Sequence, residues 1–406
     1  MIFSFIVLFF SIITDAQAQP GNYRPHAPDS REQPGNYPES QPPLREQPDK
    51  SPELRSLSRE QPGNYPESQP PLREQPLFYR MQQWGSESQY SPWTVLLNGG
   101  FDILQLDRYR RDVFDYPFAQ AGRTVFGNLA KPLPLIYRYG WNQFLRNEIL
   151  PLEFSEGASW WPNYQLHLIG GGMTYVKLGE WYEQHGFAAP RVWSAATVMS
   201  YHLLNEVVEN NANEGELIDP LADIYLFDIG GILLFSIDDV ALFFSRTLHM
   251  TDWSLQPTLN VTDATLRNTG QYFVVKYDLP FWENYSLIYV FGVNGLAGLT
   301  RRFHDGTALS VAAGLRNADV IPETDNPLHL TGSLVWSAGI FYDRENSLLA
   351  SLVLSGISSN LATLNVYPGF TDIAGIRPGF WCTVTTEGRM LLGITTQWGV
   401  GIGAGE

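Results

Sequence analysis

The sequence predicts an α+β protein in which a C-terminal antiparallel β-barrel of about eight to ten strands follows a three-helix unit and a disordered, proline-rich N-terminal arm. Three observations lead to this prediction. Apolar and small residues alternate through the last third of the chain, amphipathic helix patterns occupy its middle, and proline-rich repeats lie near its start. We expect a signal peptide at residues 1–18, the arm at 19–76, a mixed strand and helical unit at 77–257, and the barrel strands at 258–406.

The first part of the chain has the pattern of an export signal followed by a repeat. Residues 2–13 are almost wholly apolar, and Ala16-Gln17-Ala18 follows with the small-residue spacing that signal peptidase reads. The block at 31–48 recurs unchanged at 59–76, and residues 19–76 hold half of the chain's 28 prolines. With so few apolar side chains to bury, this arm should be disordered. Its simplest role is a spacer; the alternatives are an arm that crosses peptidoglycan and a ligand for a proline-reading protein.

The middle of the chain is rich in helix signals. Residues 93–106 are predicted as a strand that could join the sheet, and helices are predicted at 164–185, 191–210 and 220–248. Pro190 precedes the second helix, and Pro220 lies in the first turn of the third behind Asp219 as its cap. The glycines at 170–172 predict close helix packing rather than a phosphate-binding loop, because no strand precedes them.

Strands are predicted in the last third of the chain from an alternation of period two. Met390, Leu392 and Ile394 fall on one side of a strand, and Gly393 and Thr395 fall on the other; residues 309–315 and 330–342 repeat the pattern. A face this apolar needs lipid or a protein partner, and a face this small suits a barrel interior. The two interpretations are an outer-membrane barrel and a soluble antiparallel sandwich whose apolar faces form an ordinary core.

Several features favour the membrane interpretation. The export signal takes the chain out of the cytoplasm, the single cysteine Cys382 allows no intrachain disulfide, and aromatic residues, 14% of the chain, lie near many predicted strand ends. No segment is a clean spanning helix, since the best candidate, residues 222–244, contains four aspartates. Strands would therefore carry the protein into a membrane. A net charge of −16 argues against nucleic acid as a partner, because phosphates need a basic surface.

The candidate site residues lie on the three predicted helices. His167 is on the first, His202, Glu206 and Glu209 share a face of the second, and Asp223 is on the third. If these faces meet, His167, Glu206 and Asp223 converge, which suits general acid–base catalysis with a carboxylate orienting a histidine. A metal site of His202, Glu206 and Glu209 is an alternative. A third interpretation is a buried hydrogen-bonded cluster that fixes helix packing. The sequence identifies no cofactor.

Residues 163–234 carry a resemblance to known envelope proteins. The runs HLIGGGMTY, HLLNEVVEN and DPLADIYLFDIGGILL place histidine, glutamate and aspartate on successive helices. In this order they resemble VanZ-like and YfiM-like envelope proteins, and they are similar to a Gram-negative outer-membrane family in which such a unit precedes barrel strands. The resemblance implies an envelope context and a shared role for His167, Glu206 and Asp223.

The sequence as a whole predicts an outer-membrane β-barrel envelope protein. It would contact outer-membrane lipid and serve a structural role or the passage of a small molecule. One alternative is a lipid- or envelope-modifying hydrolase that uses the His/Glu/Asp cluster. The other is a soluble periplasmic binding module.

Overall fold

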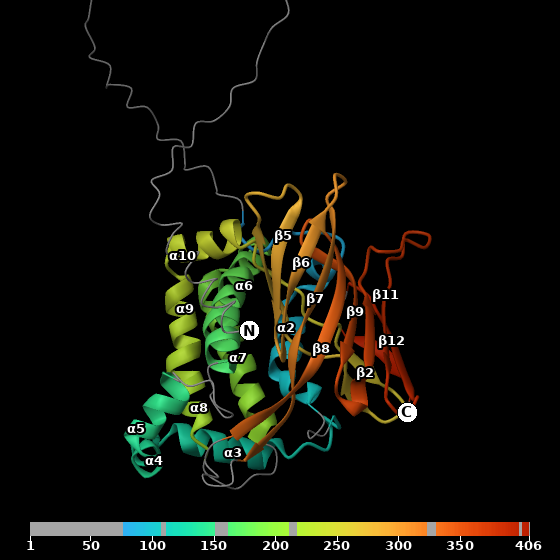
Figure 1. Ribbon diagram of the computed structural model, residues 1–406. Coiled ribbons are helices and arrows are strands. Elements are labelled where there is room, and N and C mark those ends of the chain that lie inside the picture. Colours follow the sequence, from blue (N-terminus) through green and yellow to red (C-terminus); the bar gives the residue numbers. More distant parts are fainter. Residues whose placement is uncertain are drawn as a thin grey trace, which may run out of the picture. The chain divides into compact units, whose positions relative to one another are not determined.

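The structure is a computed structural model that describes residues 76–106, 111–150, 161–210, 217–322, 330–397 and 400–405. The predicted signal peptide and all but the last residue of the predicted arm lie outside these ranges. The chain from Leu72 onward forms one compact unit. Its helices come first and its strands second, which confirms the α+β class. Figure 1 shows the blue to yellow-green helices beside the orange to red strands.

Helices fill most of the described chain up to Thr247. The α-helices are α2 (Pro92–Gly100), α3 (Phe118–Leu129), α4 (Pro132–Tyr139), α5 (Trp141–Phe144), α6 (Gly172–Gln184), α7 (Pro190–Asn210), α8 (Asp219–Ala222), α9 (Ile229–Phe235) and α10 (Asp238–Leu242). The 3-10 helices in this part are η1 (Ser86–Gln89) and η2 (Asp102–Gln105), and the π-helices are η3 (Leu145–Ile149), η4 (Trp161–Gly171), η5 (Asp223–Asp228) and η6 (Phe243–Thr247). Helices thus cover all three predicted ranges. Within the described residues, none is both long and apolar enough to cross a membrane.

The strand predicted at 93–106 is wrong, because this segment forms α2 and η2. Ser91 caps α2: its side chain accepts a hydrogen bond from the backbone N–H of Thr94, and the Thr94 side chain accepts one in return from the N–H of Ser91. Pro92 follows at the first helical position, where its missing N–H has no cost. These local start signals outweigh the apolar alternation that suggested a strand.

In the described part of the chain, thirteen strands form one mostly antiparallel sheet. The strands are β1 (Thr251–Asp252), β2 (Thr258–Asn260), β3 (Thr265–Arg267), β4 (Phe273–Asp278), β5 (Tyr285–Phe291), β6 (Asn294–Arg302), β7 (Thr307–Pro322), β8 (Leu330–Arg344), β9 (Ser347–Ser355), β10 (Ala362–Val366), β11 (Gly379–Val384), β12 (Met390–Thr395) and β13 (Gly401–Ala404), with the 3-10 helix η7 (Ser358–Asn360) before β10. Their order is β1-β4-β5-β6-β7-β8-β9-β10-β11-β12-β13-β2-β3. From β4 to β13 each strand pairs antiparallel with the next along the chain, and the β13–β2 pair is parallel.

The sheet is not closed into a barrel. Its two edge strands, β1 and β3, are not paired with each other. The edge of β3 is met instead by the helical part of the chain, where the N–H of Leu266 donates to the carbonyl of Arg111 at 2.9 Å. The predicted barrel of eight to ten strands is therefore wrong in closure and in strand number. A segment between η2 and α3 occupies the edge that a closing strand would need.

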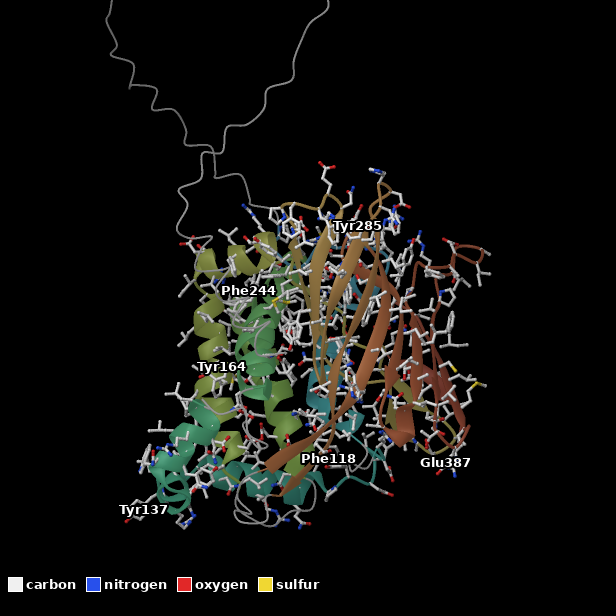
Figure 2. All side chains as sticks on the ribbon, viewed as in Figure 1. Phe118, Tyr137, Tyr164, Phe244, Tyr285 and Glu387 are labelled. Carbon is white, nitrogen blue, oxygen red and sulfur yellow. The ribbon has the colours of Figure 1, made fainter. Side chains whose placement is uncertain are left out.

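The two faces of the sheet differ in polarity as the alternation predicts. On β12, Met390, Leu392 and Ile394 are exposed, whereas Gly393 and Thr395 are buried. The side chains drawn in Figure 2 stand out on both sides of the strands. Buried polar side chains recur along the inner face of the sheet and include Ser286, Thr300, Ser310, Ser337, Ser351, Thr363, Asn365, Thr383 and Thr395. The inner face of the sheet therefore carries many polar side chains beside buried apolar ones, whereas the outer face is largely apolar.

Large side chains fill much of the space that the sheet encloses. Trp253, Tyr272, Val290, Phe341 and Tyr367 belong to one buried apolar cluster. A cavity of about 90 Å³ remains beside them. Its lining includes Gln105, Asn294, Arg316, Ser351, Thr363 and Asn365. The interior is thus a packed, partly polar core rather than an open channel.

The helices pack against β4 and β5 on one side of the sheet. Tyr289 of β5 donates from its hydroxyl to Oε1 of Gln165 on η4 at 2.9 Å. Gly170, also on η4, lies so close to the ring of Phe273 on β4 that a Cβ would come within 2.4 Å of it. This glycine lets η4 lie directly against the strand.

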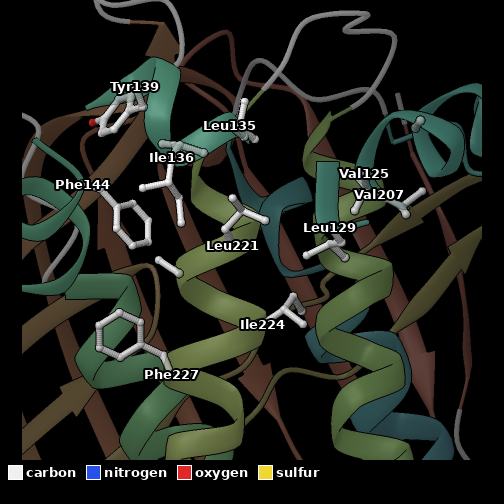
Figure 3. Close-up of a cluster of buried hydrophobic side chains, with 13 residues drawn as sticks. Val125, Leu129, Leu135, Ile136, Tyr139, Phe144, Val207, Leu221, Ile224 and Phe227 are labelled. Atoms are coloured by element: carbon white, nitrogen blue, oxygen red, sulfur yellow. The ribbon is translucent and has the colours of Figure 1, made fainter. Parts of the chain in front are cut away.

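A separate apolar core packs several of the helices against one another, as Figure 3 shows. Its buried members come from α3, α4, α5, α7, α8 and η5 and include Val125, Leu129, Leu135, Ile136, Tyr139, Phe144, Val207, Leu221, Ile224 and Phe227. Burial of an apolar side chain of this size contributes about 1.5–3 kcal/mol. The core fixes the start of η5, which carries two of the site residues, against α7.

Candidate functional site

Four buried polar residues meet where η4, α7 and η5 come together. His167 lies on η4, His202 on α7, and Asp223 and Asp228 at the two ends of η5. In a π-helix the backbone bonds run from residue i to i+5, so residues five apart face the same way. That spacing brings both aspartates of η5 to the histidines. η4 continues into α6 and η5 continues into α9, and Figure 1 shows α6, α7 and α9 beside one another.

The distances within this cluster are short. Nδ1 of His167 lies 2.9 Å from Oδ1 of Asp228, and Nε2 of the same ring lies 3.5 Å from Oδ2 of Asp223. Nε2 of His202 lies 3.1 Å from the same Oδ1 of Asp228, and the two imidazole rings are 4.7 Å apart between centroids. One carboxylate oxygen therefore faces two imidazole nitrogens.

Glycines make this approach possible, as the sequence predicted. A Cβ at Gly171 would lie 3.0 Å from Nε2 of His202. A Cβ at Gly231 on α9 would lie 2.6 Å from the carbonyl oxygen of Leu168. A side chain at either position would push His202 or η4 away, so the bare backbone is part of the site's construction.

Burial makes charge costly for His202, Asp223 and Asp228 and for the neighbouring Glu206. It raises the pKa of Asp223 and of Glu206 well above their ordinary values, and neighbouring carboxyls raise both further. Burial also raises the pKa of Asp228, against the opposing effect of His167. The pKa of His202 is lowered well below its ordinary value by burial and then by His167. In the absence of a bound cation, burial therefore favours the protonated forms of Asp223, Asp228 and Glu206 and the neutral form of His202.

Three polar atoms of the cluster are buried without a hydrogen-bond partner. They are Nε2 of His202, Oδ1 of Asp223 and Oδ2 of Asp228. The nitrogen of His202 is close enough to Asp228, but the pair does not meet the angular requirements of a hydrogen bond. Buried groups of this kind are usually satisfied, so the cluster retains free coordinating capacity.

The predicted catalytic residues are near one another. His167 and Asp223 are in contact, and Glu206 is buried close enough to Asp223 for the two carboxyls to interact electrostatically. Whether these residues catalyse a reaction remains a prediction. Among the described residues, His167, His202 and Asp228 are the group placed to bind a metal ion, with ligand atoms all within 4.8 Å of one another. This group shares only His202 with the predicted set of His202, Glu206 and Glu209.

Asp228 is the site residue that the sequence analysis missed. An α-helical period aligns Asp223 with Phe227, not with Asp228. The available signal was chemical: Asp228 is an unpaired charge between Phe227 and Ile229 in an apolar run. A buried aspartate needs a partner, and five residues is the spacing that a π-helix would supply.

No family model, curated protein or solved structure matches this chain. The resemblance to VanZ-like and YfiM-like proteins therefore remains a prediction, and the residues themselves have to supply the case for a function.

Proposed function

We propose that this is an outer-membrane envelope protein with a structural role, held in a lipid layer by the apolar outer face of its sheet. One observation carries the proposal. From β6 to β13 many large apolar side chains of the strands lie on the exposed face, while serine, threonine and asparagine side chains of the same strands are buried beside an apolar cluster. Water-soluble sheets place their apolar face in the core and their polar face in solvent, which is the opposite arrangement.

The exposed apolar side chains extend over neighbouring strands from β6 to β13. They are Leu299, Leu309, Val311, Leu334, Trp336, Ile340, Leu352, Leu354, Leu364, Phe380, Met390, Leu392, Ile394 and Ile402. Trp336 is 74% exposed and Ile394 is 61% exposed. Exposed apolar patches of soluble monomers rarely exceed a few hundred Å². Lipid would cover such a face, and each fully covered side chain would contribute about 1.5–3 kcal/mol.

The sandwich interpretation fits the strands less well. A sandwich would bury the apolar face against a second sheet, but the described strands form a single sheet. Its enclosed side is held by polar contacts. Oγ1 of Thr300 and Oγ of Ser310 are 2.7 Å apart, and Nζ of Lys276 donates to Oδ2 of Asp343 at 2.7 Å. These contacts favour a membrane protein with a polar interior over a binding module with an ordinary core.

A structural role fits better than passage of a small molecule. Trp253 and Tyr367 are almost fully buried inside the sheet, and the N-terminal segment closes one end of it. There Nε2 of Gln89 donates to Oγ1 of Thr395, and the N–H of Gly85 donates to the carbonyl of Pro368. A cavity of about 90 Å³ holds a few water molecules rather than a continuous path.

The proposal is tested by flotation of the mature protein with phospholipid vesicles after refolding. Trp336→Arg places a charge on the outer face, where it should cost about 2–4 kcal/mol in hydrocarbon and lower the floated fraction at least tenfold. Trp93 on α2 is also 74% exposed but lies off the sheet, so Trp93→Arg is the matched control and should float like the wild type. A wild-type chain that is monomeric in detergent-free buffer and fails to float would overturn the proposal.

A second candidate is a lipid- or envelope-modifying hydrolase, because His167 lies between two carboxylates. This is the arrangement of a general base oriented by an acid. Lipid extracts of cells with and without the protein would reveal a modified lipid class, and His167→Gln should abolish that difference. Identical extracts in the two strains would eliminate this candidate.

A further inference from the structure

We propose that His167, His202 and Asp228 bind one divalent transition-metal ion of the zinc class, with Asp223 beside the other ring nitrogen of His167 at 3.5 Å. The inference does not depend on the proposed contact between the outer face of the sheet and lipid. It concerns only the junction of η4, α7 and η5, and it differs from the set of His202, Glu206 and Glu209 that the sequence suggested.

The spacing of the ligand atoms suits such an ion. Oδ1 of Asp228 lies 2.9 Å from Nδ1 of His167 and 3.1 Å from Nε2 of His202. Zinc bonds to nitrogen and oxygen are about 2.1 Å long, which places tetrahedral ligand atoms about 3.4 Å apart. Shifts of a few tenths of an ångström would therefore open the group to an ion. Two histidines and a carboxylate are a ligand set that zinc, iron and manganese share.

The charge of the cluster also calls for a cation. Asp223, Asp228 and Glu206 are all buried, and within the described ranges none of the three forms an ion pair with lysine or arginine. Two other buried acids do have such partners: Glu87 pairs with Lys177 at 2.6 Å and Asp343 pairs with Lys276 at 2.7 Å. Buried carboxylates are ordinarily paired, hydrogen-bonded or bound to metal. A divalent ion would neutralise charge that the protein leaves uncompensated.

The unpartnered atoms provide independent support. The Asp228 side chain is 0% exposed, yet its Oδ2 has no hydrogen bond, and Oδ1 of Asp223, whose side chain is 5% exposed, has none either. Nε2 of His202 completes this set. Each of these atoms can supply a lone pair, provided that His202 carries its proton on the other ring nitrogen. A metal ion would satisfy polar groups whose burial without a partner is otherwise unfavourable.

The surrounding residues would hold the ligands in place. Oδ2 of Asp223 lies 3.5 Å from Nε2 of His167, and Gly171 leaves room for the His202 ring. Partners of this kind orient metal ligands. Because the centre is enclosed by three helical segments, loading of the ion should be coupled to their assembly and should stabilise the fold. The competing account is a cluster that shares protons and holds no ion.

Metal binding by the untagged mature protein separates the two accounts. After treatment with a chelator, the protein is titrated with Zn²⁺ and with Co²⁺. We expect about one ion per chain, visible Co²⁺ absorption that indicates nitrogen ligands, and a raised unfolding temperature. Asp228→Asn keeps the shape of the side chain and should weaken Zn²⁺ binding about 100-fold or more, since changes outside the ligand set alone cost 10–100-fold.

Two matched controls accompany this variant. Asp252→Asn changes another buried aspartate, one that is hydrogen-bonded to Ser254, and His304→Gln changes an exposed histidine. Both should bind Zn²⁺ like the wild type. The proposal is overturned if the wild type takes up no Zn²⁺ at tens of micromolar free ion, or if Asp228→Asn binds with unchanged affinity. The Co²⁺ spectrum of the wild type keeps the test decisive even if a variant fails to fold.

Discussion

Oδ1 of Asp228 lies 2.9 Å from Nδ1 of His167, although 61 residues separate the two in the chain. Both residues belong to π-helical segments, η5 and η4. π-Helical stretches are rare and occur frequently at functional sites. The altered period is what turns Asp228 toward the histidines, so the local backbone and the polar cluster depend on each other.

We expect Gly231→Ala to separate these helices. A Cβ there would lie 2.6 Å from the carbonyl oxygen of Leu168 and 3.0 Å from that of His167. Relief requires η4 and α9 to move apart, which should destabilise the protein by about 1–3 kcal/mol in denaturant unfolding. Gly127→Ala on α3 meets nothing within 4 Å and should stabilise by about 0.5–1 kcal/mol. Equal stability of the two variants would contradict this account of the contact.

The features that follow from local periodicity could be predicted from the sequence. The alternation at Met390, Gly393 and Ile394 predicted which side chains share a face, and the exposure of each agrees. The helical ranges also follow from patterns within one element. The proximity of His167 to Asp223 required in addition that two helix faces meet, which the glycines permit.

Features that depend on pairing across the sheet could not be predicted. β1 has two residues, and β2 and β3 have three each, which is too short for a periodic signal. The parallel pairing of Ile402 with Leu259 joins segments more than a hundred residues apart. Nothing local to either strand specifies such a partner, so neither the open edge nor the number of strands could be predicted from the sequence.

The cap of α2 gives a second prediction. Ser91→Ala removes the acceptor for the N–H of Thr94 and should destabilise the protein by about 1 kcal/mol. Ser200 on α7 is exposed, and its hydroxyl donates to the carbonyl of Ala196 within the same helix, so Ser200→Ala should be nearly neutral. Unfolding midpoints of the two variants under identical conditions provide the comparison. A neutral Ser91→Ala would show that the cap contributes little to α2.

The ion pair inside the sheet gives a third. Lys276 and Asp343 are 2.7 Å apart, with side chains only 3% and 1% exposed. Lys276→Met leaves the Asp343 carboxylate without this cation, and we expect a loss of about 3–5 kcal/mol. Adding Asp343→Leu removes the stranded charge and should restore most of that loss. A double-mutant cycle in denaturant measures the coupling, and additive losses would exclude a strong interaction.

Asp102 on η2 should make stability depend on pH. Burial raises the pKa of its carboxyl to about 7, although the N–H of Gln271 at 2.7 Å and Nε2 of Gln105 at 3.0 Å donate to it and act in the opposite direction. Between about pH 4 and pH 7 the carboxyl therefore keeps its proton in the folded protein, whereas in the unfolded chain, with a pKa near 3.8, it has released the proton. The folded state binds the extra proton, so stability falls as pH rises between these values.

Asp102→Asn tests this dependence, because the amide keeps an oxygen for Gln271 and cannot titrate. The contribution of the wild-type carboxyl should be complete below about pH 4 and lost as the pH rises through about 7. Free energies of unfolding measured between these limits should fall less steeply for Asp102→Asn than for the wild type. Asp115→Asn, at an exposed position, should keep the wild-type slope. If Asp102→Asn and the wild type have the same slope, the carboxyl at this position does not hold its proton in the folded state.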